Sequence, residues 1–202
     1  EPENVRRVPL VARSLTSLAG YVLRGIPEIS LKPDATRAVD YLRHAATFFN
    51  DKDAQFEFAK LLLRGEGVPQ DLPTARHYLS TLAEAGHASA QAFLADLHWR
   101  GKSVPKDERR AMALGKMAVE NAPPEERIWI EDIYQSIYCG TSRDVREQSK
   151  GLVAAWQRLF AQRPPEAKER QRMALGAMPG RDIGPFRTCA NGEPVDINRS
   201  AT

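Results

Sequence analysis

The chain has 202 residues, of which 42% are apolar and 27% are charged. This length and composition suit one domain, or one domain with an appendage, and they supply enough apolar side chains for a continuous core. The net charge of +3 is too small to predict nucleic-acid binding. No apolar run approaches the ~18 residues that span a bilayer, so no membrane insertion is expected. The chain begins at Glu1 without a Met or a basic-then-apolar leader, and we expect a processed protein or an excised piece.

Residues 12–122, which follow an N-terminal lead-in over residues 1–11, contain one pattern three times. The segment "LLRGEGVPQD", which ends at Asp71, returns 36 residues later as "HWRGKSVPKD", and an earlier, looser copy contains Arg24-Gly25. Self-similarity at a period of this length predicts stacked structural repeats. The expected copies cover about residues 12–50, 53–86 and 89–122.

Each copy predicts two antiparallel helices joined by a short loop. In the second copy, apolar residues recur at helical spacing from Ala54, as expected for the stripe of a first helix. Gly65 suits the left-handed backbone that follows many helix ends. Asp71 suits the N-cap of the next helix, and Pro73 is tolerated in its first turn. A second apolar stripe, from Ala75 onward, completes the pair.

A single pair of this size cannot bury its apolar stripe, so neighbouring pairs must stack on one another. The predicted fold class is therefore all-α: a right-handed α-solenoid of stacked antiparallel helix pairs with a concave inner face. Small residues at the contact positions, mostly Ala, allow the two helices of a pair to approach closely.

Residues 123–162 depart from the pattern and predict a C-terminal capping helix pair. Trp129 lies on the wide apolar stripe of the first helix. Thr141-x-x-Asp144 has the spacing of a capping box that opens the second helix. We expect Trp129 and Trp156 in the core of this cap. The apolar face of the second helix consists of Leu152, Ala155, Trp156 and Leu159.

Residues 163–202 form a polar C-terminal tail. Residues 166–178 allow a short charged helix, and the remainder is rich in Gly, Pro and Asn with Phe186 as an apolar anchor. This composition predicts a linker or an arm that is extended rather than folded.

The repeats resemble a known family. The stretch "AQFEFAKLLLRGEGVPQDLPTARHYLSTLAEAGHASAQAFLADLHWRGKSVPKD" is similar to the Sel1-like repeat, a relative of the tetratricopeptide repeat. "GIPEISLKPD" (25–34), "AATFFNDKDAQ" (45–55) and "WIEDIYQS" (129–136) resemble the ExoR family, the periplasmic negative regulators of exopolysaccharide synthesis.

The resemblance to the ExoR family implies a function. It implies a non-enzymatic protein-binding regulator in the periplasm. Its partner would be the periplasmic sensor domain of a two-component histidine kinase, which the regulator binds and inhibits.

Two other function classes compete with this interpretation. Repeat chemistry by itself equally supports a general solenoid adaptor or scaffold for another envelope or cytoplasmic complex. Some cysteine-rich members of this repeat class are assigned β-lactam binding or hydrolysis, but they carry a cysteine pair within each repeat, and the repeats of this chain contain no cysteine.

No positive signal for catalysis or for a metal site is present in the sequence. His44, His77, His87 and His98 form no HxxxH or HExxH pair, and scattered histidines are most often ordinary surface or core residues. The acidic pair Glu131-Asp132 is expected at a helix start or on an exposed face, where it complements the helix dipole. The sequence therefore predicts no enzyme, no cofactor and no metal.

The two cysteines, Cys139 and Cys189, leave two alternatives open. In an oxidising compartment a disulfide is possible, and it would pin the tail beside the capping helices. Closing a loop of ~50 residues would stabilise the fold by on the order of 4 kcal/mol. The alternative is two unpaired cysteines, one buried and one in a mobile tail.

Candidate partner-binding residues lie on the inner face of the first helices, by analogy with tetratricopeptide geometry. Arg24, Arg64 and Arg100 occupy the same place in successive copies and predict a basic column, with Trp99 as an interface anchor. The simpler alternative is that these arginines solvate the last turn and complement the helix dipole. The candidates are Arg24, Phe56, Lys60, Leu63, Arg64, Asp96, Trp99 and Arg100, with Arg13, Thr16 and Leu23 beside them in the first copy.

Overall fold

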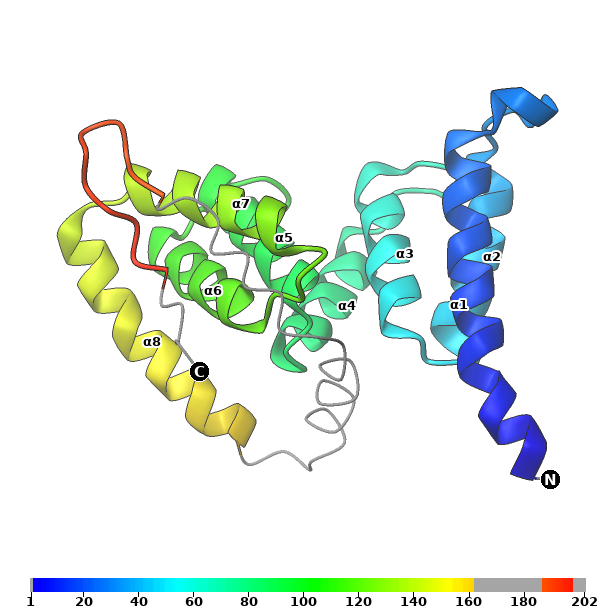
Figure 1. Cartoon of the computed structure of the whole chain (residues 1–202), viewed down its shortest axis with the longest axis horizontal. Helices are drawn as coiled ribbons and strands as arrows, with labels where there is room; N and C mark the ends of the chain where they lie inside the picture. Colours follow the sequence, from blue (N-terminus) through cyan, green and yellow to red (C-terminus); the bar gives the residue numbers. More distant parts are fainter. Residues whose placement is uncertain (1, 162–186, 198–202) are drawn as a thin grey trace. The chain divides into compact units, whose positions relative to one another are not determined.

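The structure, a computed structural model, describes residues 2–161 and 187–197. Within these residues it contains eight α-helices, one short 3-10 helix and no strand beyond two isolated bridges (Figure 1). The predicted all-α fold class is confirmed. The chain divides into two compact units, residues 1–82 and 83–202, and each unit is described by itself.

The first unit packs its helices in sequence order. The first helix, α1, packs against α2, and α2 packs against α3. Ala38, Leu42 and Leu61 are among the side chains that this packing removes from water. The elements are α1 (Pro2–Arg24), the 3-10 helix η1 (Pro27–Ile29), α2 (Ala35–Phe48), α3 (Lys52–Arg64) and most of α4 (Leu72–Glu84).

Aspartates begin the helices of the repeats, as the pattern predicts. The Asp71 carboxylate accepts a hydrogen bond from the backbone N–H of Thr74 at 3.0 Å and another from its hydroxyl. These bonds lower the pKa of Asp71 below its usual range. Asp51 and Asp107 accept in the same way, each from the N–H three residues ahead. Each carboxylate thereby satisfies a donor that the first turn leaves unpaired.

Gly67 has a packing role as well as a conformational one. Its φ is +70°, and a Cβ at this position would lie 2.4 Å from the carbonyl carbon and oxygen of Ala35. The loop between α3 and α4 therefore lies directly against the start of α2. Only glycine fits here, because any other residue meets both an unfavourable backbone conformation and backbone atoms.

The first helix leaves apolar positions exposed that later copies bury. Tyr21 occupies the same position in its repeat as Leu61 and Leu97 do in theirs. Each lies one turn before the glycine that ends the first helix. Tyr21 is 51% exposed, whereas Leu61 is 1% exposed and Leu97 is also buried. Leu61 belongs to α3, which packs on the helix before it, α2, whereas α1 packs only on helices that follow it among the described residues of its unit. The exposed apolar side chains of α1 are Val8, Leu10, Val11, Leu18 and Tyr21.

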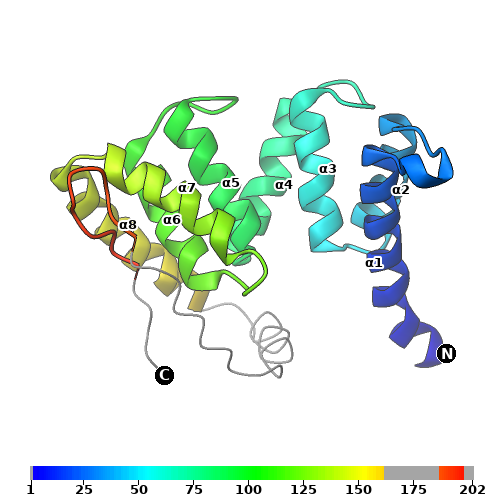
Figure 2. The same ribbon diagram turned by 45° about the horizontal axis from the view of Figure 1, so that its top comes forward.

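The second unit is built around α6. This helix packs against α5, α7 and α8, and α5 also packs against α7 (Figures 1 and 2). Glycines allow two close approaches: a Cβ on Gly115 would lie 2.9 Å from the Tyr134 ring, and one on Gly140 would lie 2.6 Å from the Trp99 ring. The helices are α5 (Ala88–Arg100), α6 (Glu108–Asn121), α7 (Arg127–Gly140) and α8 (Arg143–Ala161).

Helix α8 differs from its prediction in two respects. It begins at Arg143, where the Ser142 hydroxyl accepts from the N–H of Val145. The Thr141 hydroxyl instead donates to the carbonyl of Tyr138 at the end of α7, so the predicted capping box does not form. The covered face is also rotated: it consists of Val145, Arg146, Ser149, Leu152, Val153 and Trp156, and Ala155 and Leu159 are exposed.

Trp129 and Trp156 are half-buried rather than central to the core. The core between α6 and α7 is supplied instead by Ile130, Tyr134 and Ile137, which are almost fully buried. The covered face of α8 includes Arg146, whose guanidinium pairs with an acidic residue outside the helix.

The C-terminal segment, residues 187–197, is folded onto the second unit, which corrects the prediction of an extended tail for these residues. It forms a tight turn in which the N–H of Cys189 donates to the carbonyl of Glu193 at 2.8 Å and the N–H of Val195 donates to that of Arg187 at 2.9 Å. Cys189 and Val195 are buried. The predicted charged helix over 166–178 and the anchor Phe186 lie outside the described residues.

Candidate protein-binding surfaces

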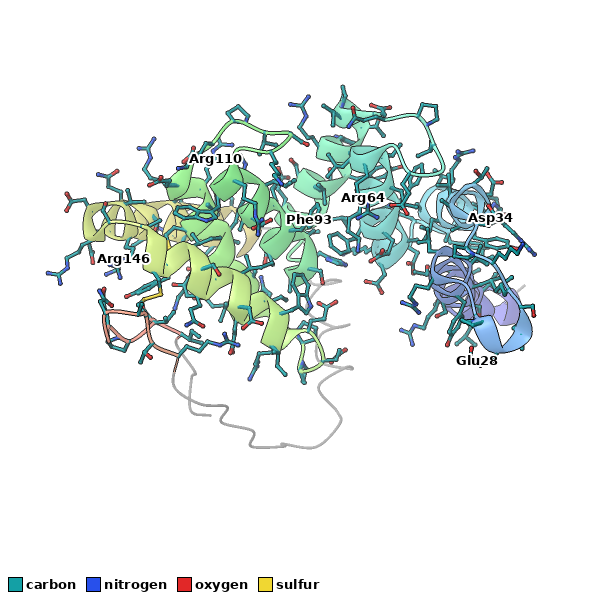
Figure 3. The ribbon with its side chains drawn as sticks, turned by 90° about the horizontal axis from the view of Figure 1, so that it is seen from above. Glu28, Asp34, Arg64, Phe93, Arg110 and Arg146 are labelled. Atoms are coloured by element: carbon teal, nitrogen blue, oxygen red, sulfur yellow. A yellow bond between two sulfur atoms is a disulfide. The ribbon has the colours of Figure 1, made fainter. Side chains whose placement is uncertain are left out.

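The two predicted arginines of the first unit lie at the exposed ends of their helices. Arg64 donates from Nε to the Glu66 carboxylate at 2.9 Å (Figure 3). The guanidinium of Arg24 lies 5.9 Å from the ring centroid of Tyr21. Both side chains are exposed and are available to a partner.

The other predicted residues of the first unit need a correction. Phe56 and Leu63 are buried, so they belong to the core and offer a partner little surface. Lys60 is half-buried. Its ammonium pairs with Glu57 at 2.7 Å and lies 4.7 Å from the Phe56 ring centroid. The α3 helix therefore presents charged atoms over a buried aromatic ring.

In the second unit the predicted residues contact one another and α7. Arg100 donates to the Asp96 carboxylate at 2.7 Å. Trp99 is half-buried, with the ammonium of Lys106 5.3 Å from its ring centroid and Gly140 against its edge. Trp99 thus helps to pack α5 on α7 as well as facing solvent.

The basic column of Arg24, Arg64 and Arg100 stays a prediction. The first two belong to the first unit and Arg100 belongs to the second. Within its own unit each arginine ends a first helix, as the repeat pattern predicts.

Three of the four histidines make local structural contacts. The Nδ1 atom of His87 accepts from the N–H of Ala90 and caps α5, and Nδ1 of His98 lies 3.1 Å from the carbonyl oxygen of Pro105. His44 stacks on Phe48 with 5.2 Å between ring centroids. Across residues 2–161 and 187–197, no group of three His, Cys, Asp or Glu side chains is placed to hold a metal ion.

The C-terminal segment is attached to the second unit by a covalent bond and a half-buried ion pair. Cys139 of α7 and Cys189 form a disulfide, which is the bonded one of the two alternatives that the sequence leaves open. Arg146 of α8 donates from its two terminal nitrogens to the two oxygens of Glu193, at 2.8 and 3.2 Å. In Figure 3 the disulfide and Arg146 lie at the same end of the unit. The paired guanidinium lowers the pKa of Glu193, and the carboxylate raises that of Arg146.

A second buried charge pair holds the start of the segment. Arg187 donates from Nε to Glu131 at 3.0 Å and from Nη1 to Asp132 and Gln135. Glu131 is buried, whereas Asp132 is exposed. The expectation that this acidic pair only complements a helix dipole is therefore wrong for Glu131.

The end of the segment is held by its backbone. Lys116 and the hydroxyl of Tyr134 both donate to the carbonyl oxygen of Asp196, at 3.1 and 3.3 Å. Burial raises the pKa of Tyr134 far above its ordinary value, and the neighbouring carboxylate of Asp196 adds to the shift. Tyr134 therefore stays protonated and acts as a hydrogen-bond donor.

Sequence reasoning missed Arg146, Glu131 and Arg187 as a group, although a signal was present. Arg146 and Glu131 interrupt apolar stripes, on α8 and α7 respectively. A charged residue on a buried stripe predicts a buried partner of opposite charge. The partners, Glu193 and Arg187, flank Cys189, so the three contacts belong to one attachment.

Comparison with known proteins identifies the repeat. The family model described as "Sel1 repeat" matches residues 12–47, 52–87 and 88–122, in three copies. The predicted Sel1-like repeats are confirmed.

Two curated relatives carry the same name, "Exopolysaccharide production negative regulator". The protein of Rhizobium meliloti (strain 1021) is 29% identical over 133 residues, which is 66% of this chain and 48% of the relative. That of Rhizobium leguminosarum bv. viciae is 26% identical over 126 residues, 62% of this chain and 45% of the relative. The chain thus spans about half the length of the curated relatives it matches.

Two solved structures share the fold. A protective antigen of uropathogenic Escherichia coli strains, described as displaying an SLR fold, superimposes with a TM-score of 0.60 at 24% identity, over 86% of this chain and 35% of that one. A Sel1 repeat protein from Oxalobacter formigenes superimposes with a TM-score of 0.55 at 23% identity, over 83% of this chain and 59% of that one.

Proposed function

Because the chain belongs to the Sel1 repeat family, we propose that it is a non-enzymatic, protein-binding regulator of exopolysaccharide production. Family membership points to an interaction scaffold rather than an enzyme. The observation that carries the proposal is the shared name of the two curated relatives. The match to the first covers 133 residues, more than the stretch from residue 12 to residue 122 holds, so the similarity is not limited to the repeats.

The proposed partner is the periplasmic sensor domain of a two-component histidine kinase. A regulator that binds only the inactive conformation of a kinase shifts the conformational equilibrium by its difference in affinity for the two states. Inhibition then needs no chemical step. It needs a surface that the inactive sensor domain matches and the active one does not.

The exposed repeat-end arginines are the proposed contact residues. Arg64 and Arg100 are each held by an acidic neighbour, Glu66 and Asp96 respectively. An arginine whose planar head is already oriented loses less conformational freedom on binding, and arginines are enriched at binding hot spots. Arg24 at the corresponding position of the first copy completes the proposed set.

Binding is tested with the full-length protein and the purified sensor domain by titration calorimetry at physiological salt. We expect binding at micromolar concentrations, and we expect Arg64→Ala and Arg100→Ala each to weaken it roughly tenfold, the loss of a typical hot-spot side chain.

Arg110→Ala is the matched control. The Arg110 side chain is 58% exposed and pairs with Asp107, much like Arg100, which is 57% exposed, and Arg64, which is 55% exposed. It belongs to the second helix of its repeat, so its loss should change the affinity less than twofold. An absence of binding overturns the proposed partner, and equal effects of all three variants overturn the proposed surface.

A periplasmic location is part of the proposal. The disulfide supports it, because such bonds persist in oxidising compartments. Among the described helices, none is both long and apolar enough to cross a membrane. Trapping free thiols with an alkylating agent in intact cells, followed by mass spectrometry, should recover Cys139 and Cys189 unlabelled. Complete labelling of both would contradict an oxidising location.

A further inference from the structure

The second unit contains a seat for a peptide turn, which in this structure is occupied by the chain itself. We define the seat by five residues that contact the C-terminal segment: Lys116 of α6, Tyr134, Gln135 and Cys139 of α7, and Arg146 of α8. Three helices thus contribute to one site. Figures 1 and 2 both show residues 187–197 running beside the second unit's C-terminal helices.

The seat binds backbone carbonyls and one carboxylate, which an acidic peptide turn can supply. Gln135 donates to the carbonyl of Thr188 at 2.8 Å, and Lys116 and Tyr134 donate to that of Asp196. These bonds are made to backbone carbonyls, so they do not depend on the side chains of the occupant. The ion pair of Glu193 with Arg146 is bidentate, the geometry that makes Arg–carboxylate contacts strong and directional.

The charges around the seat favour an acidic occupant. A cavity of about 310 Å³ between α6, α7, α8 and the segment is lined on its helical side by four basic residues and two acidic ones. The segment adds Glu193 and Asp196 to the lining, and their negative charges balance the excess of positive charge on the helical side. Without the segment, the helical wall of this cavity would have a net charge of +2, which favours an acidic side chain at this part of the seat, whereas Glu131 and Asp132 hold the basic Arg187 at the start of the segment. The basic residues are Lys116, Arg143, Arg146 and Lys150, and the acidic ones are Glu120 and Glu147.

Arg146 supplies the seat with a mostly covered positive charge. Its guanidinium lies 4.3 Å from the ring centroid of Tyr138, and its side chain is 14% exposed. Its Nε atom is buried and has no hydrogen-bond partner among the described residues. A carboxylate from the occupant therefore completes the contacts of Arg146, because charge-assisted bidentate bonds are the strongest that a guanidinium forms.

We propose that this seat is a docking site for an acidic turn of a protein partner, that residues 187–197 are its intramolecular occupant, and that the Cys139–Cys189 bond decides which of the two is bound. While the bond is intact, the chain's own segment is held in place and a partner is excluded. Once the bond is broken, the segment is held by non-covalent contacts alone and a partner competes with it.

Opening requires a dithiol reductant. The S–S bond between Cys139 and Cys189 breaks, each sulfur gains one electron and one proton, and the two thiols of the reductant become joined in a disulfide. Cys139 is exposed although Cys189 is buried, so one sulfur of the pair belongs to a residue that a small dithiol can reach. Thiol–disulfide exchange depends on this access.

The proposal is tested with a fluorescein-labelled peptide of residues 187–197 carrying Cys189→Ser, whose binding to the full chain is followed by fluorescence anisotropy. The oxidised chain should bind it weakly. A chain carrying Cys139→Ser, Cys189→Ser and Glu193→Lys, which disables its own segment, should bind it at least tenfold more tightly. Treatment of the wild-type chain with dithiothreitol should give an intermediate affinity, because a tethered segment still competes at a high effective concentration.

Two matched controls test the chemistry of recognition. A peptide that also carries Glu193→Gln and Asp196→Asn has the same length and shape without the carboxylates, and it should bind at least tenfold more weakly. Adding Arg146→Ala to the opened chain should abolish binding of the acidic peptide, whereas adding Arg110→Ala should leave it unchanged. Equal affinity for both peptides, or no binding by a folded opened chain, would overturn the proposal.

A measurement on the intact disulfide covers the case in which the opened chain fails to fold. Glu193→Gln alone removes the charge that pairs with Arg146 and leaves the covalent link in place. Hydrogen exchange at the amides of Cys189 and Val195 should then accelerate at least tenfold. An unchanged rate would show that the carboxylate does not hold the segment in the seat, which also overturns the proposal. None of these experiments involves a kinase, so their outcome is independent of the proposed function.

Discussion

The first unit, residues 1–82, depends on apolar packing and helix caps, whereas the second, residues 83–202, adds to these a disulfide and ion pairs that fasten the C-terminal segment. Both cysteines of the chain belong to the second unit. The comparison shows that units built from the same repeat can differ in what controls their stability. The first unit should respond mainly to core substitutions, and the second also to redox state and pH.

The two units can be followed separately because all three tryptophans, Trp99, Trp129 and Trp156, belong to the second unit. Tryptophan fluorescence therefore reports the unfolding of the second unit, whereas far-UV circular dichroism reports the helices of both. Amide hydrogen exchange assigns any change to a helix.

The largest expected effect is the loss of the disulfide. Cys139→Ser with Cys189→Ser removes a link between residues 50 positions apart and should lower the free energy of unfolding of the second unit by on the order of 4 kcal/mol. Denaturant unfolding followed by tryptophan fluorescence measures the change. Hydrogen exchange in α2 should stay the same. A fluorescence midpoint equal to that of the wild type would contradict the stabilising role.

The next effect compares two glycines with the same backbone conformation. Gly67 has φ +70° and a crowded Cβ position, whereas Gly192 has φ +82° and nothing within 4 Å of its Cβ position. Gly67→Ala should cost about 3 kcal/mol, because backbone strain and overpacking add. Gly192→Ala should cost about 1 kcal/mol for strain alone. Denaturation by circular dichroism and by fluorescence, respectively, measures the two losses, and equal costs would show that the contact with Ala35 is unimportant.

Helix caps should contribute equally to the stability of the two units. Asp51→Ala in the first unit and Asp107→Ala in the second each remove a hydrogen bond to the third N–H of a helix. Each should cost about 1 kcal/mol. Thermal unfolding of both variants, with the corresponding Asn variants as controls that preserve the cap, tests this equality. A difference above about 1 kcal/mol between the units would show that the caps depend on their surroundings.

The smallest effect is the pH dependence of Glu193. Its pKa is lowered in the folded chain by the hydrogen bonds from Arg146, so its contribution to stability is complete above the unfolded pKa of about 4.3 and is lost as the pH falls through the folded pKa. Glu193→Gln lacks this contribution. The difference between the fluorescence midpoints of wild type and Glu193→Gln should therefore be larger at pH 7 than at pH 3. A constant difference would contradict the ion pair.

The part of the fold that could be predicted from sequence is the part set by local contacts. Asp71 caps a helix through an N–H three residues away, and Gly65 ends a helix through its own backbone conformation. Both effects act within one turn, so the residue type and its spacing are sufficient. The repetition of these signals in three copies, the last two of them 36 residues apart, then predicts the helix pairs and their number.

The part that could not be predicted depends on contacts between distant positions. Arg146 and Glu193 are 47 residues apart, and Arg187 and Glu131 are 56 apart. Helical periodicity treats charged residues as exposed, so it placed Leu152 and Trp156 correctly on the covered face of α8 but left Arg146 out of that face, and it placed Glu131 on the surface. Composition likewise predicted that residues 187–197 are polar and extended, because amino-acid composition carries no information about a covalent link to α7.

The water-exposed apolar side chains of α1 have a practical consequence for handling the purified chain. This helix carries five such side chains, and exposed apolar surface promotes association. We expect the apparent particle size to rise with protein concentration, and sulfate, which strengthens apolar contacts, to enhance the effect. Any affinity assay of this chain should therefore be run well below the concentration at which its own light scattering begins to increase.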